Sequence, residues 1–195
     1  KGITVDALQS LNIQVLAGAT ERQPSDQSVR EVITMELRSG EQLHARAQIL
    51  LGDSYANAAA ASPPAARTPY TRRPYADSVL FHGAQLQGIT RISACDEGGI
   101  SGESNAAPPP AQWIKAPFRT QWLADPLVLD ASFQMMILWA EQIYHHGSLP
   151  TSIGRLELYA PFPASCVAID VQLQAHQAHK ANASIEFSDA HGSVI

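Results

Sequence analysis

The chain has 195 residues, of which 45 % are hydrophobic and 16 % are charged, a composition typical of a globular protein with a substantial core. Its 13 Lys and Arg residues are outnumbered by 18 Asp and Glu, giving a net charge of −5 without a basic stripe. This balance argues against nucleic acid as a partner. No apolar run reaches the roughly 18–20 residues of a membrane span, so we expect no membrane association.

The start of the chain and its two cysteines indicate a cytoplasmic protein. The first residue is Lys1 and no signal peptide follows it, so we expect a piece of a longer cytoplasmic protein. Cys95 and Cys166 lie far apart and form no CxxC pair, which argues against a disulfide framework or a zinc site. Metal-ligand spacings, phosphate-binding loops and dinucleotide fingerprints are missing from the sequence, so we expect no metal and no cofactor.

The first half of the chain contains a predicted hairpin and a predicted linker. Residues 29–51 alternate between apolar and polar side chains on both sides of Ser39-Gly40, which predicts an antiparallel pair with one apolar face. Residues 56–76 are rich in Ala and Pro and have little hydrophobic periodicity, so we expect a linker there.

The second half contains a predicted long helix followed by two strands. Apolar side chains cover most of the circumference over residues 126–146, which predicts a helix buried on most sides. Pro126 suits its first turn and Gly147 its end. Alternation over residues 167–175 predicts a strand, and residues 183–187 its partner. The periodicity alone indicates an α+β fold, and antiparallel strands wrapped around one central helix are the layout of a hotdog fold.

Asp130 and Gln134 are the strongest candidates for chemistry on the predicted helix. They are four residues apart, hence on the same helical face one turn from each other. A carboxylate and an amide on a buried helix are costly unless something polar receives them, which favours a catalytic acid oriented by the amide. The alternative is that Asp130 helps to start the helix, where a negative charge is favoured by unpaired N–H groups.

His82 is the third candidate, in a glycine-flanked apolar stretch. Its imidazole is suited to act as a base or a hydrogen-bond donor in a cleft. The pattern alone favours a histidine at a strand end, whose ring packs and bonds to the backbone.

Two segments together resemble the dehydratase domains of polyketide synthases and polyunsaturated fatty acid synthases. Residues 81–87 are similar to the GPxFQ-type motif of that family, with Ala84 in place of Pro and Leu86 in place of Phe. Residues 125–134 match its HPxLLDAxxQ/H motif, with Asp125 in place of His.

The resemblance extends to residues 13–18 and 43–47, which are similar to strands of the family's first hotdog, so it covers most of the chain. It implies an α+β double hotdog with an incomplete first hotdog. Residues 1–55 would be the remainder of the N-terminal hotdog, residues 56–76 the linker and residues 77–195 the C-terminal hotdog.

The family's chemistry implies a role for each candidate residue. Dehydratases remove water from a 3-hydroxyacyl chain that is tethered by phosphopantetheine to an acyl carrier protein, next to neighbouring synthase domains. A histidine of the first hotdog takes the α-proton, and an aspartate of the second protonates the departing hydroxyl. Asp130 matches that aspartate, and Gln134 matches the residue that steadies it.

The histidine motif of the family, HxxxGxxxxP, is not matched by any histidine of this sequence. Three hypotheses follow. The chain is a dehydratase whose histidine lies upstream of Lys1, with His82 as an alternative base. It is an inactive pseudo-dehydratase that serves as scaffold or acyl-binding module of the same synthase. Or it is an unrelated α+β binding module.

Overall fold

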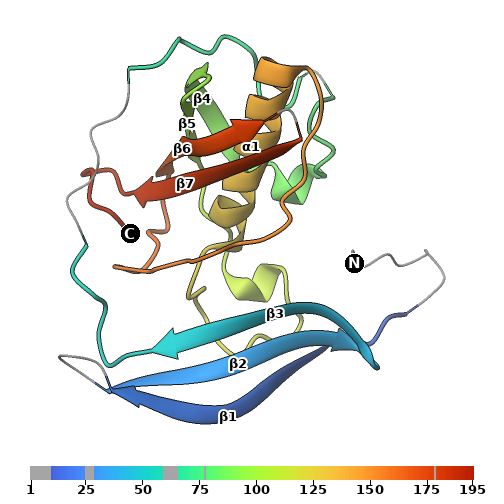
Figure 1. Ribbon diagram of the computed structural model, residues 1–195, viewed down its shortest axis with the longest axis vertical. Helices are drawn as coiled ribbons and strands as arrows, with labels where there is room; N and C mark the ends of the chain where they lie inside the picture. The colour runs from blue at the N-terminus through green and yellow to red at the C-terminus, as the bar shows by residue number, and fades with distance from the viewer. Residues whose placement is uncertain (1–9, 25–28, 59–65, 77, 178) are drawn as a thin grey trace. The chain divides into compact units, whose positions relative to one another are not determined.

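Two antiparallel sheets and one long α-helix make up the described part of the chain, which confirms the expected hotdog-like α+β class (Figure 1). The computed structural model describes residues 10–24, 29–58, 66–76, 78–177 and 179–195. The chain divides into two compact units, Lys1–Tyr55 and Ala56–Ile195, and each is described by itself.

The first unit contains a three-stranded sheet in the order β1-β2-β3. Its strands are β1 (Gln14–Pro24), β2 (Val29–Ser39) and β3 (Gln42–Leu51). The predicted hairpin is thus confirmed, and Gly40 adopts a positive φ of 57° at its tight turn. Among the described residues of this unit, Val32 is the one buried hydrophobic side chain, while six large ones are exposed: Val15, Leu16, Leu43, Ile49, Leu50 and Leu51.

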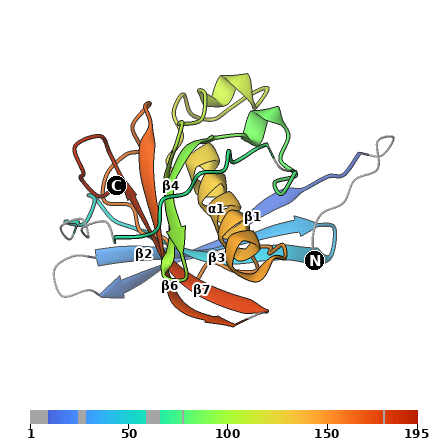
Figure 2. The same ribbon diagram turned by 90° about the horizontal axis from the view of Figure 1, so that it is seen from above.

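The second unit combines a four-stranded sheet with the helix. The sheet order is β4-β5-β6-β7, with every neighbouring pair antiparallel. Its strands are β4 (Ile89–Asp96), β5 (Gly99–Ser104), β6 (Val167–Gln177) and β7 (Lys180–Ser188), and two short 3₁₀ turns, η1 (Ala84–Leu86) and η2 (Pro110–Gln112), complete it. The helix α1 (Pro126–Tyr144) packs against β4, β5 and β6 of this sheet (Figures 1 and 2).

The helix α1 forms the core of the second unit, as its apolar composition predicts. Val128, Met135 and Trp139 are fully or almost fully buried. The indole of Trp139 donates a 3.0 Å hydrogen bond to the carbonyl of Asp96, which ties the helix to the end of β4. The helix ends at Tyr144 because His145 adopts the left-handed cap conformation with φ 57°, two residues before the predicted stop.

Part of the predicted linker belongs to the second unit. The amide of Cys95 donates to the carbonyl of Thr68 at 2.8 Å, and the amide of Tyr70 donates to the carbonyl of Ser93 at 3.1 Å. Pro69 forms a bridge with Ala94, so this segment runs along the edge of β4. Its backbone is therefore held in place from residue 68 onwards.

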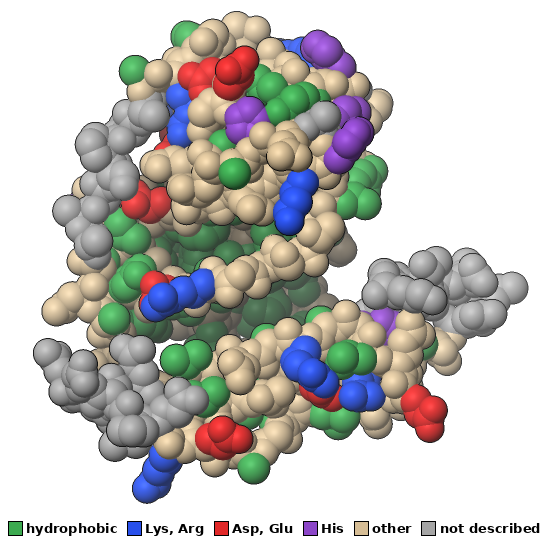
Figure 3. All heavy atoms as spheres, in the orientation of Figure 1, with side chains coloured by type: hydrophobic (Ala, Val, Ile, Leu, Met, Phe, Trp, Pro, Cys, Tyr) green, Lys and Arg blue, Asp and Glu red, His purple; other side chains and the backbone are tan. Residues whose placement is uncertain are grey.

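Two further properties bear on the partners of the protein. Charged side chains of both signs are interspersed on the face shown in Figure 3. The helices in the described ranges include none with the length and hydropathy needed to cross a bilayer.

Candidate active site

The two segments singled out in the sequence meet at the first half of α1. The Gln134 side-chain Nε2 donates a 2.7 Å hydrogen bond to the carbonyl of Leu86 in η1. The chain approaches the helix closely at Gly88, where a Cβ atom would lie 2.7 Å from the Leu127 Cγ. Glycine is therefore required there for the loop to reach the helix. The bond uses the backbone of Leu86, so the departure from the family's Phe leaves this contact unchanged.

Asp130 presents a partly exposed carboxylate that is held from behind by a buried amide. Its Oδ2 accepts a 2.7 Å hydrogen bond from Nε2 of Gln134, which is itself fully buried. The Asp130 side chain is 30 % exposed, so the carboxylate faces solvent while its support does not. The helix is capped by Asp125, and Asp130 lies beyond the first turn. The alternative that Asp130 starts the helix is therefore wrong.

His82 lies beside Asp130. Its Nε2 is 3.8 Å from Asp130 Oδ2, and its side chain is only 9 % exposed. The ring stacks on Phe81 with 4.5 Å between centroids, while Nδ1 is buried without a hydrogen-bond partner among the described residues. The structure thus brings all three sequence-predicted residues together, although the sequence pattern alone favoured a packed histidine.

Tyr75 also belongs to this cluster, and the sequence analysis missed it. Its hydroxyl donates a 2.9 Å hydrogen bond to Oε1 of Gln134 and accepts one from the Ile89 amide at 2.9 Å. Burial raises the pKa of the Tyr75 phenol above its ordinary value near 10, and the charge of Asp130 acts in the same direction, against the bond from Ile89. Tyr75 lies in the stretch interpreted as linker, where only an isolated aromatic residue could have drawn attention to it.

Asp125 stands where the family motif has His, and it is a structural residue here. Its carboxylate is buried and accepts hydrogen bonds from the amides of Leu127 and Val128 at 2.9 Å each and of Ala107 at 2.8 Å. All of these donors belong to the backbone, so Asp125 caps the helix and fixes the preceding loop. In the described part of the chain, it makes no bond to the Asp130 cluster.

The arrangement is suited to moving a proton. A partly exposed carboxyl is fixed by an amide donor and stands beside an imidazole, so it presents one acid–base group to a molecule outside and a second next to it. Within the described ranges, His, Cys, Asp and Glu side chains form no group of three or more that could hold a metal ion.

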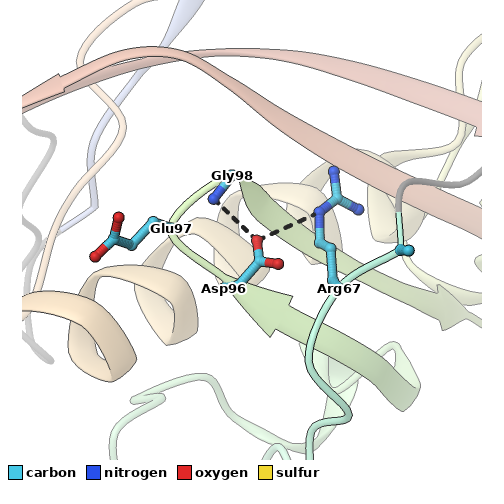
Figure 4. A pocket seen from close by; sticks show the side chains of 5 residues that line it. Arg67, Asp96, Glu97 and Gly98 are labelled. Carbon is cyan, nitrogen blue, oxygen red and sulfur yellow. Dashed lines mark hydrogen bonds and ion pairs between the residues drawn. The ribbon is translucent and has the colours of Figure 1, made fainter.

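A second polar cluster lies elsewhere in the same unit and has a structural character. Arg67 is 2 % exposed and bonds to Asp170, to Ser101 and to the carbonyl of Val171. Hydrogen bonds from Arg67, Ser101 and Gln172 more than offset the effect of burial and lower the pKa of Asp170. Figure 4 shows the open depression beside it, where Arg67 also pairs with Asp96 at 3.9 Å. Its charges neutralise one another, so it offers no free group for catalysis.

Comparison with known proteins identifies a family and a relative. Residues 55–195 match the family model described as "Polyketide synthase dehydratase N-terminal domain". The chain is also 30 % identical over 169 residues to a polyunsaturated fatty acid synthase from Thraustochytrium sp. (strain ATCC 26185 / S-3). The aligned region is 84 % of this chain but only 6 % of that relative. No solved structure matches the chain.

The matched range coincides almost entirely with the second compact unit, which holds the Asp130 cluster. Its description names the N-terminal domain of a dehydratase, whereas the resemblance implied a C-terminal hotdog for residues 77–195. The division into hotdog halves and linker stays a prediction.

Proposed function

The chain belongs to the polyketide synthase dehydratase family, and on this premise we propose that it removes water from a 3-hydroxyacyl thioester carried on the phosphopantetheine arm of an acyl carrier protein. The observation that carries the proposal is the Asp130 carboxyl, partly exposed and supported by a buried amide. This is the group that a departing hydroxyl needs, since hydroxide leaves poorly unless it is protonated.

In the proposed reaction, a base removes the proton from C2 of the acyl chain. The electrons of that C–H bond form the C2–C3 double bond, and the C3–O bond breaks with its electron pair on oxygen. Asp130 donates its proton to that oxygen, so water leaves and a 2-enoyl thioester remains. Gln134 holds the carboxyl in place through its 2.7 Å bond to Oδ2.

The base has two candidate sources. None of the seven histidines is followed four residues later by glycine, as the family motif requires. His82 is the candidate within these residues, supported by its position 3.8 Å from Asp130 and by its Nδ1, which has no partner among the described residues. The other candidate is a histidine of the longer protein.

The missing motif also supports a second candidate function, an inactive dehydratase that holds the acyl chain or acts as a scaffold in the synthase. The acyl carrier protein and neighbouring synthase domains are the proposed partners in both cases. A cytoplasmic setting is part of the proposal and is supported by the two free cysteines, Cys95 and Cys166.

The test is a dehydration assay of the chain on a 3-hydroxyacyl pantetheine thioester, with loss of one water followed by mass spectrometry. We expect Asp130→Asn to lower the rate by at least about 100-fold, because asparagine cannot donate an acidic proton. Asp53→Asn, which alters an exposed carboxylate of the first unit, is the matched control.

The outcomes separate the candidates. Turnover that is lost in His82→Gln identifies His82 as the base. Turnover that survives Asp130→Asn at the wild-type rate removes Asp130 from the mechanism. A folded chain that shows no turnover but binds the thioester supports the inactive form.

A further inference from the structure

A chain of hydrogen bonds runs behind Asp130 and has a fixed direction. The Ile89 backbone amide can only donate, so the Tyr75 oxygen accepts from it and turns its own proton toward Oε1 of Gln134. At the other end of the side chain, the carbonyl of Leu86 can only accept, so it faces the Nε2 of Gln134. Both ends therefore require the same orientation of the Gln134 amide.

This orientation decides what Asp130 meets. With Nε2 forward, the amide donates to the Asp130 Oδ2 at 2.7 Å and to Leu86. A flipped amide would place Oε1 against the carboxylate and the Leu86 carbonyl, so three oxygen atoms would face one another without a proton. It would also turn Nε2 toward the hydroxyl of Tyr75, which already accepts from Ile89.

We propose that Tyr75 is a positioning residue of the site, which holds the Gln134 amide in the one orientation that supports the Asp130 carboxyl. The catalytic significance of this role rests on the proposed function, whereas the positioning itself does not. Tyr75 acts from outside the helix, from the segment between residues 66 and 76. It packs against the hydrophobic core of the unit, and this burial fixes the height of its hydroxyl beside Gln134.

The first experiment follows the side-chain amide of Gln134 by ¹H–¹⁵N NMR in the full 195-residue chain. The resonance pair is assigned by its loss in Gln134→Met. We expect two well-separated proton signals with slow solvent exchange, because the amide is fully buried and each proton is bonded. In Tyr75→Phe we expect faster exchange and a shift of both signals. Tyr159→Phe, which removes a hydroxyl bonded to Glu157, is the control.

Unchanged Gln134 signals and exchange in a folded Tyr75→Phe chain would overturn the proposal. This experiment needs no turnover, so a chain that fails the dehydration assay can still show the positioning. The proposed function and this inference therefore fail separately.

The second experiment is a double-mutant cycle in the dehydration assay. We expect Tyr75→Phe to lower kcat about tenfold at unchanged KM, the factor that corresponds to one hydrogen bond. In the Gln134→Met background, Tyr75→Phe should cause no further loss, because the group that it positions is already missing. Losses that multiply in the double variant would show that Tyr75 acts independently of Gln134 and would overturn the proposal.

Discussion

At the scale of single residues, two aspartates five positions apart in the same segment have different functions. Asp125 is buried and is bonded to three backbone amides, while Asp130 is partly exposed and bonded to a side chain. We expect Asp125→Ala to lower the free energy of unfolding by about 2–4 kcal/mol, because a helix cap is lost and the Ala107 amide is left without its acceptor. Urea unfolding followed by circular dichroism measures this loss.

The control for Asp125 is Asp125→Asn, which keeps one side-chain oxygen as acceptor and should lose about half as much. Equal unfolding midpoints for Asp125→Ala and the wild type would contradict the capping role.

Residue-scale prediction from the sequence succeeded where spacing carries information. The four-residue interval between Asp130 and Gln134 predicts a shared helical face, and their side chains are bonded there. Tyr75 could not be predicted in this way, because its partners lie 14 and 59 residues along the chain. Only the tertiary fold brings such groups together, and the Ala/Pro-rich surroundings of Tyr75 carry no periodic signal.

At the scale of elements, the pair formed by Arg67 and Asp170 joins the segment before β4 to strand β6. Arg67 is almost fully buried, so loss of its partner leaves a buried charge. We expect Asp170→Asn to lower the free energy of unfolding by about 3–5 kcal/mol at pH 7, as measured by urea unfolding. Glu186→Gln, on the neighbouring β7, replaces a carboxylate by an amide outside this pair and is the control.

The same pair predicts how stability depends on pH. The pKa of Asp170 is lower in the folded protein than its ordinary value near 3.8. A carboxyl with a lowered pKa contributes stability that is fully present above its unfolded pKa and is lost as the pH falls toward the folded value. The difference in unfolding free energy between wild type and Asp170→Asn should therefore shrink below about pH 4. A difference that stays constant down to about pH 2 would contradict this assignment.

Elements were predictable from the sequence where hydrophobic periodicity is strong, as in the 29–51 hairpin, α1 and β6. Strand β5 was not predicted, since its sequence GISGES carries two glycines and little alternation. Close packing explains them: a Cβ at Gly99 would lie 1.9 Å from the Val171 carbonyl, and one at Gly102 would lie 2.5 Å from that of Arg91. These constraints come from neighbouring strands and leave no trace in local periodicity.

At the scale of the whole molecule, the two units differ in how much core they contain. The buried hydrophobic cluster lies entirely in the second unit, whereas the described part of the first unit buries Val32 alone. A three-stranded sheet with little buried apolar surface opens at a small free energy. We therefore expect the amides of residues 29–51 to lose protection from hydrogen exchange at a lower urea concentration than the second unit needs to unfold.

The two free cysteines report on the second unit in the same samples. Burial, with a smaller contribution from Asp96, raises the pKa of the Cys95 thiol to about 11, so this thiol should resist alkylation in the folded chain at pH 8. Cys166 is exposed and should react at once, which makes it the internal control. We expect Cys95 to become labelled only at urea concentrations well above those that expose the amides of residues 29–51, as followed by mass spectrometry. Labelling of Cys95 together with the loss of amide protection in the first unit would show one cooperative transition and would contradict the separate stability of the two units.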